Sequence, residues 1–183
     1  MPRACGWQAC LIEPDPRFFK SLEQRYHDNP RVTLLNEFIY KENINDLFKR
    51  AGVPKDFEVL SIDVDGPDYY LWQALTDFKP KIVLIESNPS IPPGESYVVA
   101  EADAFRLSGT AQEGASLQSL YELGRQKGYH LIYIELSGAN LFFIHDSCLE
   151  YFDIEGITPD ILYQAPQFGA LAGGKAPNGR GYP

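Results

Sequence analysis

Carboxylate and amide side chains follow two apolar segments near the middle of the chain, and such side chains can accept protons or bind cations. Asp63 and Asp65 follow the first segment, and Glu86 and Asn88 follow the second. In an open α/β sheet, the carboxyl ends of neighbouring parallel strands border one crevice, where such folds bind their ligands. If the two segments are neighbouring parallel strands, we expect these four side chains to meet at one site.

Two kinds of chemistry are compatible with this set of side chains. A carboxylate such as Asp63 or Glu86 can act as a general base that accepts a proton from a substrate. Alternatively, the oxygens of Asp63, Asp65, Glu86 and Asn88 are the ligand type that Mg²⁺, Ca²⁺ and Mn²⁺ prefer, so a divalent metal is a possible cofactor. A simpler role stays open for Glu86, which can pair with a nearby cation.

Turn formation offers a simpler explanation for part of the acidic cluster. The segment Asp65-Gly66-Pro67-Asp68 is typical of a tight turn, in which Asp68 caps the helix that follows. That explanation does not cover Asp63, which we expect inside the apolar strand end, where an unpaired buried carboxylate is costly. We therefore expect a site role for Asp63 and a cap role for Asp68, and Asp65 fits either role.

Short apolar runs alternate with segments of helical periodicity along the chain. Strands are expected at residues 9–12, 31–40, 57–64, 81–86, 129–135 and 139–145, and helices at residues 17–27, 45–51, 69–75 and 116–126. This alternation predicts an α/β fold with a mostly parallel, Rossmann-like sheet. The last two strands predict an antiparallel hairpin at one edge, and the irregular segment 87–114 is long enough to indicate a functional loop.

Three segments resemble one enzyme family. The L-S-I-D-V-D-G-P-D segment at residues 60–68 resembles the K-I-D-V-E-G-x-E motif of the FkbM-type class I methyltransferases. Gly128-Tyr129 is similar to the family's G-Y helix end, and the segment 139–144 is similar to its N-x-F-F closing strand. The resemblance runs from Ala9 to His145. It implies a Rossmann-like class I methyltransferase sheet, S-adenosylmethionine as cofactor, and methylation of an oxygen atom of a small molecule or saccharide.

The same resemblance implies a role for several residues. Glu13 matches the acidic residue that ends the second strand of the family and binds the cofactor ribose, since a carboxylate can accept hydrogen bonds from both hydroxyls. Asn36 and Glu37 match the region that contacts the adenine, and Asp63 matches a position near the reacting methyl group. Without the resemblance, Glu13 is an ordinary solvated acid in a turn before a helix.

The family also begins with a strand and a glycine-rich turn, which the start of this sequence does not match. Residues 1–8 contain a single glycine, Gly6, and no G-x-G pattern. We therefore expect a chain truncated at its N-terminus, and a sheet whose gap a second copy or a partner chain fills. Two further hypotheses are a non-catalytic methyltransferase-like domain that binds a partner chain, and a metal-dependent O-methyltransferase.

Composition and charge disfavour several classes of partner. The chain has 183 residues, enough for a sizeable core, and its net charge of −9 disfavours binding to nucleic acid. No apolar run is long enough to span a membrane, and three cysteines without regular spacing indicate reduced thiols in a cytoplasmic protein. We expect a methyltransferase-like domain at residues 1–150 and a Pro/Gly-rich extension at residues 151–183.

Overall fold

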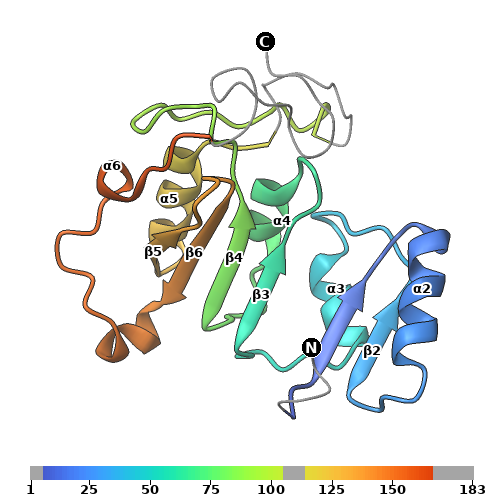
Figure 1. Cartoon of the computed structure of the whole chain (residues 1–183). Coiled ribbons are helices and arrows are strands. Elements are labelled where there is room, and N and C mark those ends of the chain that lie inside the picture. The colour runs from blue at the N-terminus through green and yellow to red at the C-terminus, as the bar shows by residue number, and fades with distance from the viewer. Residues whose placement is uncertain (1–5, 105–113, 167–183) are drawn as a thin grey trace. The chain divides into compact units, whose positions relative to one another are not determined.

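The computed structural model describes residues 6–104 and 114–166, in which short strands and helices alternate (Figure 1). In chain order the elements are β1 (Ala9–Ile12), α2 (Pro16–Tyr26), β2 (Val32–Leu35), α3 (Ile44–Arg50), β3 (Val59–Ile62), α4 (Asp68–Ala74), β4 (Ile82–Glu86), α5 (Leu117–Gln126), β5 (Tyr129–Ile134), β6 (Asn140–His145), the 3₁₀ helix η1 (Asp146–Tyr151) and α6 (Pro159–Leu162). This order agrees with the α/β alternation that the sequence predicts.

The chain divides into two compact units, Met1–Pro54 and Lys55–Pro183. The elements β1, α2, β2 and α3 belong to the first unit, and the other elements belong to the second. A two-stranded sheet pairs β1 with β2, and a four-stranded sheet has the order β3-β4-β6-β5. Each sheet therefore lies within one unit.

The first unit begins as a strand–helix–strand segment. β1 and β2 pair in parallel, with Ile12 opposite Leu35. Pro16 begins α2, and the Asp15 side chain caps the helix by accepting a hydrogen bond from the Arg17 N–H (2.8 Å). A proline in the first turn and an aspartate at the N-cap are both favourable for helix initiation, so the local sequence explains where α2 begins.

The buried core of the first unit is small. Among its described residues, the buried side chains are Ile44, Leu47 and Phe48 on α3, whereas no residue of β1, β2 or α2 is buried. Two large apolar side chains, Trp7 and Phe18, are 49% and 61% exposed. A two-stranded sheet with so little core has low stability by itself.

A mixed sheet forms the centre of the second unit. β3 and β4 pair in parallel, with Ile62 opposite Ile85. β6 pairs antiparallel with β4, and β5 pairs antiparallel with β6. The parallel pairing of β3 with β4 and the terminal hairpin are as the sequence predicts.

Aromatic rings fill the core of the second unit. Trp72 on α4 is 1% exposed, and its ring centroid lies 4.9 Å from that of Phe143 on β6 and 5.6 Å from that of Tyr129 on β5. On α5, a Cβ at Gly124 would lie 2.8 Å from the Phe143 ring, so glycine allows this close approach. Since Trp72 and Gly124 both contact Phe143, α4 and α5 cover the same face of the sheet.

The sheet architecture differs from the prediction in two respects. The sequence predicts one mostly parallel, Rossmann-like sheet, whereas the described residues form two small sheets with two parallel and two antiparallel pairings. The strand predicted at residues 31–40 ends at Leu35. There the Asn36 side-chain amide donates hydrogen bonds to the carbonyl oxygens of Glu13 (2.7 Å) and Pro14 (3.1 Å), which favours a turn over a continued strand.

The described segment that follows η1 is part of the second unit and includes α6. α6 contacts α5 and β5, and the Tyr163 hydroxyl donates a hydrogen bond to the Pro89 carbonyl oxygen (3.1 Å). In the hairpin turn, a Cβ at Gly138 would lie 2.5 Å from the Gln164 carbonyl oxygen. α6, Tyr163 and Gln164 therefore pack against the rest of the second unit, and residues 167–183 of the predicted C-terminal extension lie outside the described residues.

None of the helices between residues 6 and 166 has the length and apolar character needed to cross a membrane. Cys10 and Cys148 are free thiols, and burial raises the pKa of the Cys10 thiol. The third cysteine, Cys5, lies outside the described residues.

Ser116 connects the start of α5 to the preceding loop. Its side chain is buried, and its Oγ accepts hydrogen bonds from the N–H groups of Tyr97 (3.0 Å) and Ser119 (3.2 Å). We expect Ser116→Ala to lower the free energy of unfolding by about 2–4 kcal/mol, because two N–H groups lose their acceptor. Urea unfolding followed by circular dichroism measures this loss. The exposed Ser96→Ala variant is the control, and an equal loss in both variants would contradict the prediction.

Candidate functional site

The turn after β3 has a backbone conformation that few residues adopt. Asp65 has a φ of 56°, in the left-handed region, and Gly66 has a φ of 135°. Gly66 also approaches the segment that follows β4, since a Cβ at this position would lie 2.3 Å from the Ala104 carbonyl oxygen. Both the backbone conformation and the available space therefore require glycine at position 66.

Asp68 is the buried carboxylate of this turn. It is 2% exposed, and its two oxygens accept hydrogen bonds from the N–H groups of Val64 (3.1 Å) and Gly66 (3.0 Å). The predicted cap role is wrong, because Pro67 is the N-cap of α4 and Asp68 is the first helical residue. The Asp68 carboxylate instead closes the turn that carries Asp63 and Asp65.

Asp63 lies on the exposed side of the strand end. Leu60 and Ile62 are buried, whereas Ser61 and Asp63 are exposed, as the two-residue alternation of a strand requires. The prediction of a buried Asp63 is therefore wrong. Partial desolvation and the negative charge of Asp65 still raise the pKa of the Asp63 carboxyl, which makes its carboxylate a better proton acceptor.

Burial dominates the electrostatics of Asp68. It raises the pKa of Asp68 to about 6, although hydrogen bonds from Gly66 and Val64 favour the charged form and oppose the shift. The negative charge of Asp63 adds a smaller increase in the same direction. The Asp68 carboxyl therefore exchanges its proton only a little below neutral pH.

The segment between β4 and α5 packs against the same turn. The Tyr70 hydroxyl on α4 donates a hydrogen bond to the Val99 carbonyl oxygen (2.8 Å), and Ala104 faces Gly66. A single antiparallel bridge between Val98 and Ala115 ties the segment to the start of α5. The predicted functional loop thus contacts the acidic turn through its described part, and residues 105–113 lie outside the described residues.

Glu86 lies at the end of β4, on the strand next to Asp63. Because Ile62 is paired with Ile85, Asp63 and Glu86 occupy the same level of two neighbouring parallel strands. On its other side, β4 pairs Glu86 with Asn140 of β6. The expected juxtaposition of the acidic strand ends of β3 and β4 is therefore present in the backbone register.

Asn88 and the metal hypothesis are less consistent with the geometry. The Oδ1 of Asn88 accepts a hydrogen bond from the Ser90 N–H (3.0 Å), so this oxygen serves a local turn. Between residues 6 and 166, outside the gap at 105–113, no three His, Cys, Asp or Glu side chains are grouped so that they could hold a metal ion. Asp63, Asp65 and Glu86 are therefore not grouped as a set of three metal ligands among the described residues.

Glu13 occupies a strand end in the first unit. It directly follows β1, and its N–H donates a hydrogen bond to the Leu35 carbonyl oxygen (3.0 Å) of β2. Its Oε1 accepts a hydrogen bond from the Asp15 N–H (2.7 Å). The other carboxylate oxygen, Oε2, has no hydrogen-bond donor among the described residues, so it is free to accept one from a ligand.

Asn36 and Glu37, the predicted adenine contacts, both have partners in the fold. The Asn36 amide holds the turn after β1 through the carbonyl oxygens of Glu13 and Pro14. Glu37 forms an ion pair with Arg50 at the end of α3. Asn36 therefore positions the backbone of Glu13, and the Glu37 carboxylate is neutralised by Arg50.

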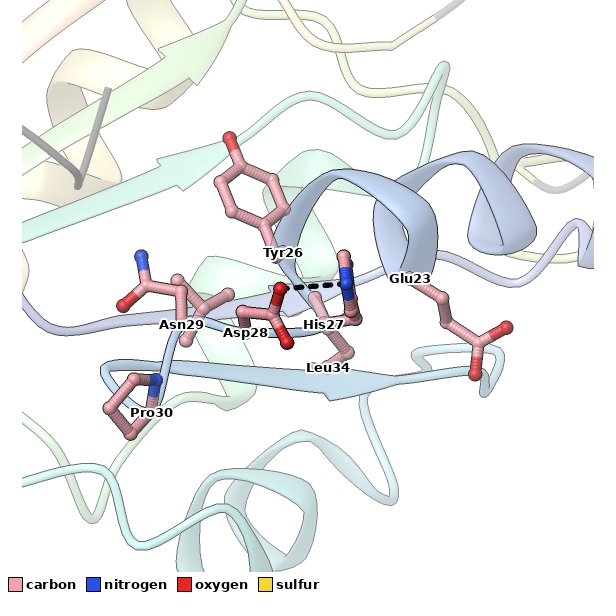
Figure 2. Close-up of a pocket in the computed structure, with 8 residues that line it drawn as sticks. Glu23, Tyr26, His27, Asp28, Asn29, Pro30 and Leu34 are labelled. Carbon is pink, nitrogen blue, oxygen red and sulfur yellow. Dashed lines mark ion pairs between the residues drawn. The ribbon is translucent and has the colours of Figure 1, made fainter.

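A separate pocket lies at the other end of β2. It has a volume of about 530 Å³ and lies beside Tyr26, His27 and Asp28, with the His27 Nε2 atom 2.8 Å from the Asp28 carboxylate (Figure 2). The Nδ2 atom of Asn29 is buried there without a hydrogen-bond partner among the described residues. Because this pocket borders the amino end of β2, it is remote from the carboxyl end of β1, which carries Glu13.

No protein-family model matches the chain, and no curated protein matches its sequence.

Two contacts of the site were not predicted from the sequence. These are the approach of Ala104 to Gly66 and the hydrogen bond from Tyr70 to Val99. Both contacts join segments far apart in the sequence. The Gly66-Pro67 pair predicted the turn but did not indicate which segment packs against it.

Proposed function

We propose that the chain is a class I methyltransferase-like domain that uses S-adenosylmethionine to methylate an oxygen atom of a small molecule or saccharide. The observation that carries this proposal is the acidic turn after β3. It presents Asp63, with a raised pKa, at the carboxyl end of a strand that is parallel to β4. In open α/β sheets such strand ends border the ligand crevice.

The residues of the first unit fit part of the cofactor. The Oε2 atom of Glu13 has no donor among the described residues, as a ribose-binding carboxylate requires. Nearby in the sequence, Phe38 and Tyr40 are 61% and 39% exposed, and their rings stack with centroids 6.1 Å apart. A planar base such as adenine can pack on such a surface.

In this proposal, catalysis depends mainly on how the substrate hydroxyl is positioned relative to the cofactor and to the carboxylate that accepts its proton. The cofactor, when bound, supplies the electrophilic methyl group. Asp63 or Glu86 accepts the proton of the substrate hydroxyl, and the turn closed by Asp68 fixes where the Asp63 carboxylate lies. The raised pKa of Asp63 brings this group closer to the working range of a general base.

Isothermal titration with S-adenosylhomocysteine tests the proposal. We expect wild-type protein to bind and Glu13→Ala to bind about 10- to 100-fold more weakly, because a hydrogen bond to a charged group contributes about 1.5–3 kcal/mol. Glu23→Ala is the matched control, since Glu23 lies on α2 beside the separate pocket. Absence of binding to the wild type at millimolar ligand, or equal losses in both variants, would contradict the proposal.

A further inference from the structure

One edge of β3 pairs with β4, and among the described residues no strand pairs with its other edge. The hydrogen bond from the Ile82 N–H to the Glu58 carbonyl oxygen (2.8 Å) shows which backbone groups face β4. In a parallel ladder every second residue bonds to a given neighbour, so the N–H and C=O groups of Val59 and Ser61 face the opposite edge. Within the part of the chain that the structure describes, no strand pairs with that edge.

Apart from its short length of four residues, β3 lacks the sequence features that usually protect an edge strand. Charged side chains, prolines, bulges or a covering helix prevent unwanted strand addition. β3 has the sequence V-L-S-I, which contains no charge and no proline. The edge strand at the other side of this sheet, β5, has a register shift between Leu131 and Tyr133, and α6 packs against it. Of the two edges of this sheet, β3 is therefore the one suited to accept a strand.

Apolar side chains beside this edge are exposed to solvent. Val59 and Val64 are each 37% exposed, although parallel strands normally have both faces covered. Ser61 lies between them and is also exposed. An added strand with apolar side chains would cover this surface as well as pair with the backbone.

The charged side chains at the two ends of β3 indicate which kind of partner can bind. Asp63 and Asp65 at one end of the edge have no ion pair among the described residues, whereas Glu58 at the other end pairs with Lys81 (3.5 Å). A second copy that paired its own β3 antiparallel would bring Asp63 of one chain toward Glu58 of the other. The net charge of −9 on each chain adds to this repulsion. A basic partner is therefore favoured over a second copy.

We propose that the free edge of β3 binds an extended apolar strand of another protein that carries Lys or Arg where it passes Asp63 and Asp65. Such strand addition uses the backbone groups of Val59 and Ser61 for affinity and side-chain contacts for specificity. The inference does not rest on methyl transfer, because no cofactor takes part in this contact.

Amide hydrogen exchange on the full chain tests the proposal, with the synthetic peptide K-V-T-V-T-V-K as probe. In the free chain we expect the Val59 and Ser61 amides to exchange at least about 10-fold faster than those of Leu60 and Ile62, which face β4. The peptide should slow exchange at Val59 and Ser61 by about 10-fold or more. The acidic peptide E-V-T-V-T-V-E should leave it unchanged.

Two variants separate the backbone contact from the charge contact. Ser61→Pro removes an N–H that faces the free edge, so it should abolish peptide protection, whereas Ser61→Ala should retain it. The double variant Asp63→Asn, Asp65→Asn keeps every backbone group and should lose the preference for the basic peptide. This second variant keeps the test valid if Ser61→Pro does not fold.

Three results would overturn the proposal. Slow exchange of Val59 and Ser61 in the free monomer would show that another segment of the same chain covers the edge. A dimer in light scattering with β3 protected would identify a second copy as the occupant. Equal protection by the acidic and basic peptides would show that the edge of β3 does not prefer a basic partner.

Discussion

Replacement of Gly66 by alanine is expected to lower the free energy of unfolding of the second unit by about 3–5 kcal/mol. Gly66 has a φ of 135°, and a Cβ at this position would lie 2.3 Å from the Ala104 carbonyl oxygen. The contacting atom belongs to the backbone, so a side-chain rotation cannot relieve the overlap. The turn after β3 or the segment around Ala104 must shift, and a shift of the turn weakens the hydrogen bonds that Asp68 accepts from Val64 and Gly66.

Gly94→Ala is the matched control for this experiment. Gly94 also has a positive φ of 84°, but no atom lies within 4 Å of the position that a Cβ would occupy. Alanine at this position should lower the free energy of unfolding by only about 1 kcal/mol, because the positive φ is its single unfavourable feature. Urea unfolding followed by the fluorescence of buried Trp72 measures both variants. Equal losses for Gly66→Ala and Gly94→Ala would contradict the close contact with Ala104.

Asp68→Asn is expected to change how stability depends on pH. In the folded chain the pKa of Asp68 is raised from its ordinary value of 3.8 to about 6. The folded state therefore holds this proton more tightly than the unfolded state does. The protonated Asp68 carboxyl thus contributes to the free energy of unfolding, and this contribution is fully present below about pH 4 and is lost as the pH rises through 6. A shift of this size corresponds to about 3 kcal/mol. The stability of the wild type relative to Asp68→Asn should thus fall by about this amount between pH 4 and pH 7.

Urea midpoints at intervals from pH 4 to pH 7 measure the effect. Asp46→Asn is the control, because the Asp46 side chain is 76% exposed and lies 3.7 Å from Lys49 on the same helix. Its profile should run parallel to that of the wild type. If the profile of Asp68→Asn is also parallel to the wild type, the buried carboxyl does not have the raised pKa assigned to it.

Much of the element order could be predicted from the sequence because short-range signals agree. The strand at Ala9–Ile12 is an apolar run that ends before Pro14, and α2 begins where Asp15 and Pro16 favour a helix start. The parallel pairing of β3 with β4 follows from two apolar runs joined by a helical segment. Local composition therefore predicts the α/β class and the final hairpin.

The roles of the acidic residues could not be predicted in the same way. The sequence places Asp63 and Asp68 in one turn, but their burial depends on the phase of β3 and on the positive φ of Asp65. That backbone rotation directs the N–H groups of Val64 and Gly66 toward Asp68, so Asp68 becomes the buried carboxylate. Likewise, Asn36 ends β2 through a partner 23 residues away, which no local pattern reveals.

Chemical-shift mapping with S-adenosylhomocysteine on ¹⁵N-labelled protein tests the central claim most directly. The proposed function predicts saturable shifts of the amides of Glu13, Asn36 and Phe38, which belong to the proposed ribose- and adenine-binding region. The amides of His27 and Asn29, which line the separate pocket, should stay unchanged. Shifts confined to His27 and Asn29, or no shifts at millimolar ligand, would contradict a cofactor site at the carboxyl ends of the strands.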